Sequence, residues 1–168
     1  GGRHVKSRGR VSLVFSDRVG APFTTGLLRP TIYLPSSLRS NPHARSLVLK
    51  HEARHVREGH ALVSLVEAVH ARLCWYNPLA HVLQRDGSLV REHSCDSSVG
   101  ERYSSREYCD VLLDQADRLL HSGGMVLASG MGKRDLHKRI KYLNDPAIMK
   151  RTRRSALLFV AASTLVAG

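Results

Sequence analysis

The sequence predicts an α+β fold that is mainly helical, with a small antiparallel β-sheet near the N-terminus. Short extended runs bounded by turn residues are confined to the segment before Pro35, and apolar residues recur at helical spacing from Pro42 onward. The 168 residues include 42% hydrophobic and 24% charged side chains, which is the composition of an ordinary globular domain with a core of moderate size.

Two or three short strands are expected at the N-terminal end. Val11 to Phe15 begins with a β-branched residue, Pro22 to Thr25 precedes Gly26, and Thr31 to Leu34 lies between two prolines. Thr31 to Leu34 comes directly before the first helix, and we expect this strand to present an exposed edge of the sheet. Such an edge could align an extended peptide by adding it as a further strand.

Helices are expected over the rest of the chain. Asn41 is suited to the N-cap of the first helix and Pro42 to its first turn, and this helix should reach the break at Gly59. Periodic apolar residues and turn signals then predict further helices at Ala61 to Trp75, Pro78 to about Val99, Ser105 to His121 and Lys133 to Leu143.

The first helix contains the motif His51-Glu52-Ala53-Arg54-His55, an HExxH pattern. Side chains four residues apart lie on one face of a helix, so both histidines can bind one zinc ion. Glu52 would lie beside the metal as the general base that takes a proton from water and later passes it to the leaving amine. The alternative is a pair of solvated helix histidines, which leaves the glutamate between them unexplained.

A catalytic zinc site needs a third protein ligand, for which we select Glu92 on the third expected helix. Glu58 and Glu67 follow His55 too closely to reach the same ion. Asp96 lies one turn beyond Glu92 and is expected to accept a hydrogen bond from the other ring nitrogen of a ligand histidine, although an ordinary helix salt bridge would also place an aspartate there.

Several polar residues near these helices receive no role in coordination. His60 and His93 do not keep the four-residue register of the motif, and Cys95 is interpreted as a small buried thiol. The residue that stabilises the oxyanion is left open among Tyr103, His93 and Arg91.

Net charge and cysteine content limit the classes of protein to which the chain can belong. The formal net charge of +12 would attract polyanions, but no aromatic interleaving or recognition helix accompanies it, so direct nucleic-acid binding is not expected. Three cysteines without CxxC spacing indicate neither a disulfide framework nor a thiolate zinc site.

Residues 151–168 combine a basic flank with an uncharged run, which predicts the start of a truncated transmembrane helix after a domain at residues 1–150.

Five blocks in the chain together resemble the BlaR/MecR-type membrane zinc metallopeptidases, a gluzincin-like family. These blocks are Pro22 to Pro30, Ile32 to Pro35, His51 to His55, Trp75 to Pro78 and Arg91 to Asp96. The resemblance spans about Val11 to Asp145. Two departures stand out: His60 occupies a position that is commonly acidic in relatives, and an extracellular penicillin-binding sensor module is absent from these residues.

The resemblance implies a zincin-like fold and a zinc-dependent endopeptidase domain on the cytoplasmic side of a multi-span membrane protein. It also implies that His51, His55 and Glu92 bind Zn²⁺, that Glu52 is the general base, and that the substrate is a cytosolic protein such as a transcriptional repressor, or the protein itself. Segments flanking the domain would attach it to the membrane. The competing interpretation is a non-catalytic, zinc-stabilised module that holds a regulatory partner at the membrane.

Overall fold

The structure is a computed structural model that describes residues 4–8, 10–121 and 133–144. Four strands come first: β1 (His4–Arg8), β2 (Val11–Ser16), β3 (Phe23–Thr25) and β4 (Thr31–Pro35). A short 3-10 turn, η1 (Ser36–Arg39), leads into five helices: α1 (Pro42–Arg57), α2 (His60–Leu73), α3 (Pro78–Gly100), α4 (Ser105–His121) and α5 (Lys133–Asn144). The α+β class and its helical majority are thereby confirmed.

The sheet differs in detail from the expectation. Its strand order is β1-β2-β4-β3, and β2 pairs with β4 in parallel while the two outer pairings are antiparallel, so the sheet is mixed. The prediction that Thr31 to Leu34 is an edge strand is wrong, because β4 lies between β2 and β3. The edges are β1 and β3. Strand β1 was not expected, since its sequence contains several basic and polar side chains instead of an apolar run.

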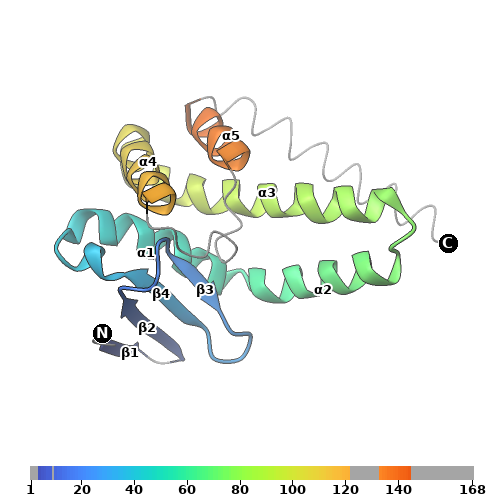
Figure 1. Cartoon of the computed structure of the whole chain (residues 1–168), viewed down its shortest axis with the longest axis horizontal. Coiled ribbons are helices and arrows are strands. Elements are labelled where there is room, and N and C mark those ends of the chain that lie inside the picture. The colour runs from blue at the N-terminus through green and yellow to red at the C-terminus, as the bar shows by residue number, and fades with distance from the viewer. Residues whose placement is uncertain (1–3, 9, 122–132, 145–168) are drawn as a thin grey trace.

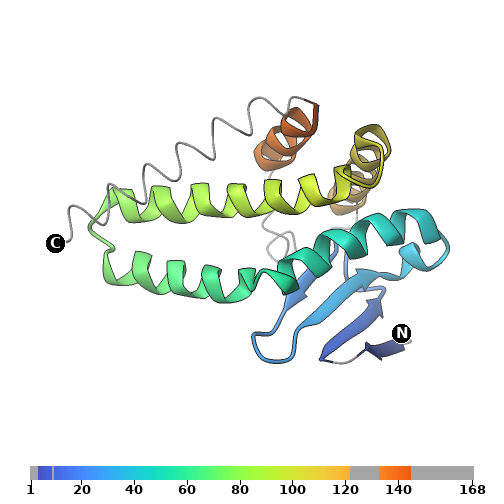
Figure 2. The same cartoon turned by 180° about the vertical axis from the view of Figure 1, so that it is seen from behind.

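Helix α1 occupies the centre of the molecule, with the sheet against one side and α3 and α4 against the other (Figures 1 and 2). It begins as expected, since the Asn41 side chain accepts a hydrogen bond from the Ala44 amide at 3.0 Å. Two neighbouring residues of α1 face opposite layers: Val48 packs in a core cluster with Ile32 and Leu34 of β4, while Leu47 packs with side chains of α3 and α4.

Helices α2 and α3 form a long antiparallel hairpin that extends away from the sheet (Figure 1). Gly59, with φ of 65°, adopts the left-handed conformation that ends α1 and redirects the chain into α2. Within the described ranges, no helix is both long and apolar enough to cross a bilayer. The basic flank and truncated span predicted for residues 151–168 lie outside those ranges.

Candidate metal centre

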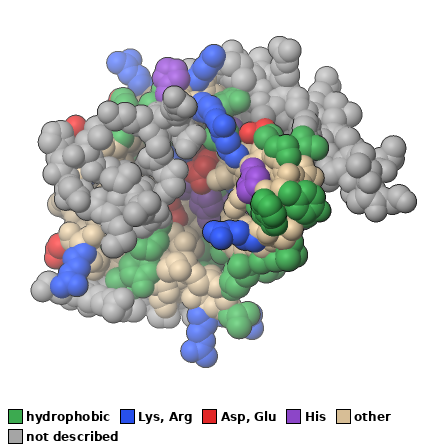
Figure 3. All heavy atoms as spheres, turned by 45° about the vertical axis from the view of Figure 1, so that its right-hand side comes forward, with side chains coloured by type: hydrophobic (Ala, Val, Ile, Leu, Met, Phe, Trp, Pro, Cys, Tyr) green, Lys and Arg blue, Asp and Glu red, His purple; other side chains and the backbone are tan. Residues whose placement is uncertain are grey.

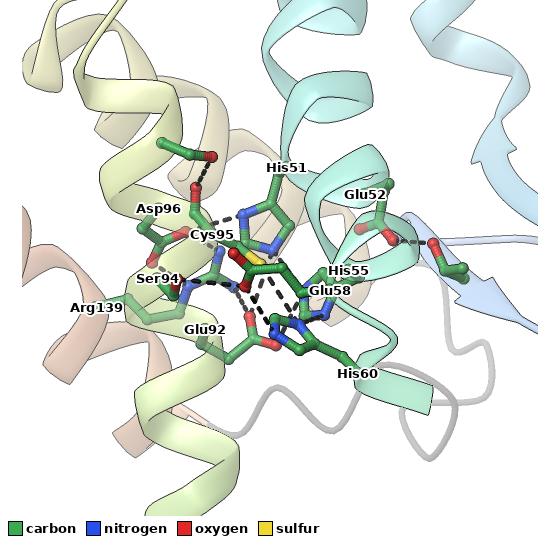
Figure 4. A network of polar contacts seen from close by, with 12 residues as sticks. His51, Glu52, His55, Glu58, His60, Glu92, Ser94, Cys95, Asp96 and Arg139 are labelled. Atoms are coloured by element: carbon green, nitrogen blue, oxygen red, sulfur yellow. Dashed lines mark hydrogen bonds and ion pairs between the residues drawn. The ribbon is translucent and has the colours of Figure 1, made fainter. Parts of the chain in front are cut away.

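The two core contacts of α1 decide where the side chains of the HExxH motif point. His51 lies one turn after Leu47 and therefore faces α3, whereas Glu52 lies one turn after Val48 and faces the sheet. Figure 4 shows the histidines directed toward α3 and the Glu52 carboxylate directed toward β3. One helix thus presents the candidate ligands and the candidate base on adjacent faces of the same turn.

His51, His55 and Glu92 converge in the space between α1 and α3 (Figure 4). The Nε2 atoms of the two histidines are 3.1 Å apart. The two oxygens of the Glu92 carboxylate each approach one histidine: Oε2 lies 3.5 Å from His51 Nε2, and Oε1 lies 3.4 Å from His55 Nε2. An ion among three donors at these separations can lie about 2.0–2.2 Å from each of them, as zinc requires, so this donor set fits the metal.

Cys95 belongs to a second possible donor set. One atom from each of His51, His55 and Cys95 lies within 4.8 Å of the others. The Cys95 side chain is fully buried, and burial followed by the charges of Glu92 and Asp96 raises the pKa of its thiol well above the ordinary value. The same side of α3 therefore offers two different third ligands, a carboxylate and a thiol.

The Nδ1 atom of His51 is held by two groups on the side away from Glu92. It lies 3.1 Å from Asp96 Oδ1 and 2.9 Å from the Tyr108 hydroxyl of α4. Tyr108 in turn donates a hydrogen bond to Asp96 Oδ1 at 2.8 Å. A proton on Nδ1 directed at Asp96 leaves Nε2 with a free lone pair on the side of Glu92, which is the tautomer that a metal ligand needs.

Arg139 of α5 neutralises this buried carboxylate. Its Nε and Nη2 atoms donate to the two Asp96 oxygens at 2.8 and 2.6 Å, and its Nη1 atom lies 3.2 Å from Glu92 Oε2. Asp96 and Arg139 are only 2% and 5% exposed. Burial opposes ionisation of Asp96, but the charge and hydrogen bonds of Arg139 outweigh it and hold the pKa of Asp96 well below its usual range.

The surroundings of the proposed ligands raise the pKa of His51 and lower the pKa values of Glu92 and His55. Burial would lower the pKa of His51, but hydrogen bonds to Asp96 and Glu92 outweigh burial and raise it to about 9. Burial would likewise raise the pKa of Glu92, but the hydrogen bond to His51 and the charge of Arg139 lower it to about 2. Burial lowers the pKa of His55 to about 4. Without metal, His51 and Glu92 form an ion pair and His55 is neutral at pH 7.

His60 and Glu58 support His55 from the side opposite Glu92. The Nδ1 atoms of His60 and His55 are 2.9 Å apart, and His60 Nε2 lies 2.9 Å from Glu58 Oε2. With His55 Nε2 directed at an ion, its Nδ1–H donates to His60, and the Nε2–H of His60 donates to Glu58. His60 therefore links the ring of His55 to the carboxylate of Glu58.

Glu52 is held at the edge of the sheet. The Thr24 hydroxyl of β3 donates a hydrogen bond of 2.6 Å to Glu52 Oε2. Burial raises the pKa of Glu52, although the nearby charge of His51 and this hydrogen bond oppose the increase. A carboxylate with a raised pKa accepts a proton more readily than an ordinary glutamate at neutral pH.

A cavity of about 450 Å³ opens beside these side chains, and its lining includes Thr24, His51, Glu52, His55 and Glu92. The side chain of His51 is 8% exposed, that of His55 is 18% exposed, and that of Glu92 is 30% exposed. The space between His51, His55 and Glu92 is therefore open on the side of His55 and Glu92 and closed behind His51. Water and a substrate can approach it from the open side.

The three candidates for oxyanion stabilisation occupy different places. Arg91 lines the cavity, although it also pairs with Glu67 at 2.6 Å. Tyr103 lies instead 3.1 Å from the Ser46 hydroxyl, and the His93 ring packs against Tyr142 with centroids 3.7 Å apart. Of the three, Arg91 alone is among the residues that line the cavity.

Sequence reasoning missed Thr24, Tyr108 and Arg139. Arg139 falls in a basic helix and resembles its exposed neighbours in composition, but it lies three residues after Leu136 and one before Ile140, on the apolar stripe of that helix. A charged residue within an apolar stripe signals a buried ion pair. Tyr108 and Thr24 carry no comparable signal, since tyrosine and threonine are ordinary core and strand residues.

Comparison with known proteins identifies the family of the chain. A family described as BlaR1 peptidase M56 matches residues 2–143. The regulatory protein BlaR1 of Bacillus licheniformis is 26% identical over 124 residues, which cover 71% of this chain and 21% of that protein. The chain therefore corresponds to about a fifth of the length of this relative. The family resemblance carried by the five sequence blocks is confirmed, and the chain belongs to the BlaR1 peptidase M56 family.

Proposed function

We propose that this chain is a zinc-dependent endopeptidase domain that hydrolyses peptide bonds with water. The observation that carries the proposal is the convergence of two Nε2 atoms and one carboxylate, separated by 3.1 to 3.5 Å, in the cavity that also contains Glu52. Membership of a peptidase family supports the same reaction class.

In this proposal His51, His55 and Glu92 hold the zinc ion, and Asp96 fixes the tautomer of His51. When bound, zinc supplies Lewis-acid polarisation of the scissile carbonyl and increases the acidity of the attacking water. The open side at His55 and Glu92 is the position that a catalytic site reserves for water and substrate.

Glu52 is the general base in this proposal. Its carboxylate takes a proton from the attacking water and passes it to the leaving amine. The Thr24 hydroxyl holds one carboxylate oxygen and leaves the other free to accept this proton. Burial raises the pKa of Glu52 above its ordinary value, which suits a group that must both accept and donate a proton in one cycle.

The substrate is placed along β3 instead of the strand selected from the sequence. In the described sheet β3 pairs on one side with β4 alone, so its other edge is available for main-chain hydrogen bonds. Thr24 lies in the middle of β3 and contacts Glu52, so a peptide added along this edge would pass beside the base.

Replacement of the base tests the reaction. Glu52→Gln should keep stoichiometric zinc, measured by atomic absorption, and lose cleavage of fluorescein-labelled casein by at least a hundredfold, because general-base catalysis contributes about 10²–10⁴-fold. Glu101→Gln, in the exposed turn after α3, is the matched control and should retain activity. Unchanged cleavage by Glu52→Gln would exclude the proposed role.

A closed structural zinc site is the competing proposal, and the position of Cys95 favours it. If Cys95 joined His51 and His55, the thiolate would occupy the position needed for water. We favour Glu92, because its carboxylate lies 3.5 Å from His51 Nε2 and 3.4 Å from His55 Nε2, whereas the atoms of the Cys95 set are separated by up to 4.8 Å. Glu92→Gln should therefore weaken zinc binding far more than Cys95→Ser, and the reverse order would support the non-catalytic module.

The biological setting is proposed from the family. The domain would act on the cytoplasmic side of a multi-span membrane protein with a regulatory role, with residues 1–150 as the peptidase unit and its flanking segments as the membrane attachment. Its substrate would be a cytosolic protein, such as a transcriptional repressor, or its own chain. Direct binding to nucleic acid is not part of the proposal.

A further inference from the structure

The hairpin of α2 and α3 has an unusual distribution of side chains, with apolar groups outside and an ion pair inside. In the described residues, the large apolar side chains that are exposed belong to this hairpin and its turn, except Leu27, Leu28 and Leu113. They are Leu62, Val63, Leu65, Val66, Val69, Leu73, Trp75, Tyr76, Leu79 and Val82. In water such a surface costs free energy, since each buried methylene gains about 0.8 kcal/mol.

The contact between the two helices is built from small and charged residues. Ala71 and Ala80 are almost fully buried, at 3% and 2% exposed. Glu67 of α2 and Arg91 of α3 form an ion pair of 2.6 Å, and a Cβ at Gly87 would lie only 2.6 Å from the Glu67 carboxylate. Gly87 thus permits the ion pair to close. Small residues and polar contacts between helices, with large apolar residues outside, are the rule for helices that pack in lipid.

The end of the hairpin has the chemistry of a membrane interface. Trp75, the single tryptophan of the chain, is 74% exposed, and Tyr76 is 72% exposed. Arg72 lies three residues before Trp75 and is also exposed. Aromatic and basic residues are enriched together at the level of lipid headgroups. Figure 3, which brings this side forward, shows apolar side chains gathered there with basic side chains and a histidine beside them.

We propose that the α2–α3 hairpin itself binds the surface of an anionic lipid bilayer, independently of any flanking transmembrane segment. The 14 residues of α2 span about 21 Å, which is too short to cross a hydrocarbon core of about 30 Å. The 23 residues of α3 are long enough but include charged side chains, and no described helix is apolar enough to cross, so the hairpin lies in one leaflet. The net charge of +12 attracts the anionic headgroups, and it comes from the chain outside the hairpin, because residues 60–100 contain three arginines and four acidic side chains. The apolar face of α2 supplies the burial. This inference does not depend on zinc or on peptidase activity.

Vesicle binding of the whole chain tests this proposal, with Trp75 as the reporter. Vesicles of phosphatidylcholine with 30% phosphatidylglycerol are mixed with the protein, and the tryptophan emission and its quenching by brominated lipid chains are recorded. We expect a blue shift and quenching, because Trp75 moves from water to the boundary between the headgroups and the acyl chains. Binding should weaken on addition of 0.5 M salt, since salt screens the attraction to the headgroups.

The double variant Leu65→Gln and Val69→Gln should lower the partition coefficient by roughly tenfold or more, because both side chains lose their burial in lipid. Leu113→Gln on α4 is the matched control, since Leu113 is 49% exposed, close to the 48% of Leu65, and it should bind as the unchanged protein does. All three substituted positions are about half exposed, so circular dichroism should show the same melting curve for the unchanged protein, the double variant and the control.

Two results would overturn the proposal. One is the absence of tryptophan quenching at saturating lipid, and the other is equal vesicle binding by the double variant and the control. Light scattering provides a further check. If the protein does not bind vesicles but forms dimers, and the double variant is monomeric, the hairpin is an interface between two copies of the chain and the lipid assignment is wrong.

Discussion

Replacement of Arg139 by methionine gives the sharpest test of how the centre is held together. The guanidinium forms two hydrogen bonds of 2.8 and 2.6 Å with Asp96, which is 2% exposed, and a third contact with Glu92. Methionine keeps much of the side-chain volume but removes the charge, so the Asp96 carboxylate is left buried and poorly compensated. Breaking a buried pair in this way costs about 3–5 kcal/mol.

That loss would be a large part of the total stability, which is about 5–15 kcal/mol for a typical domain. The free energy of unfolding is measured by urea denaturation of the metal-free protein. The matched control is Arg118→Met, because Arg118 forms an exposed i,i+4 pair with Asp114 on α4 and should contribute no more than about 0.5 kcal/mol. Adding Asp96→Asn to Arg139→Met should recover part of the loss, since the buried charge is gone. Equal effects of the two arginine variants would refute the reasoning.

Three further predictions concern zinc binding and are checked by competition with a chelating dye. Tyr108→Phe removes the hydroxyl beside His51 Nδ1, so zinc affinity should fall by roughly tenfold with little change in fold. Unchanged affinity would show that the hydroxyl does not position His51. His60→Leu leaves His55 Nδ1 without its partner and should weaken binding to a similar extent, whereas His70→Leu, at an exposed site on α2, should not. Below the pKa of about 9, the proton on metal-free His51 must leave before zinc binds, so the affinity should rise about tenfold per pH unit between pH 6 and 8; an affinity independent of pH would contradict the ion pair with Glu92.

Much of the helical framework could be predicted from the sequence because its signals are local. Asn41 caps α1, Pro42 begins it and Gly59 ends it, and these are properties of single residues in a known backbone conformation. The same local geometry places His51 and His55 on one face. Glu92 required only the further assumption that two helices pack side by side, and the structure brings its carboxylate to both histidines.

The pairing of the strands and the support of the centre could not be predicted in this way. Strand β2 pairs in parallel with β4 and not with the nearer β3, and no short motif encodes that choice. The contact of Arg139 with Asp96 spans 43 residues and exists only because α5 packs on α3. Partners of this kind depend on the packing of whole helices, so the sequence alone indicates the candidate ligands but not the side chains that hold them in place.

The origin of these supporting groups determines how small a functional fragment can be. The candidate base is held from β3 by Thr24, His51 is held from α4 by Tyr108, and Asp96 is held from α5 by Arg139. A fragment that ends after Asp96 would contain every residue selected from the sequence, yet its buried aspartate would lack a compensating charge and His51 would lose the hydroxyl beside Nδ1. The family match ends at residue 143, within the last turn of α5. The candidate metal centre and the fold therefore depend on the same length of chain, and we expect truncation before α5 to lower zinc affinity and stability together.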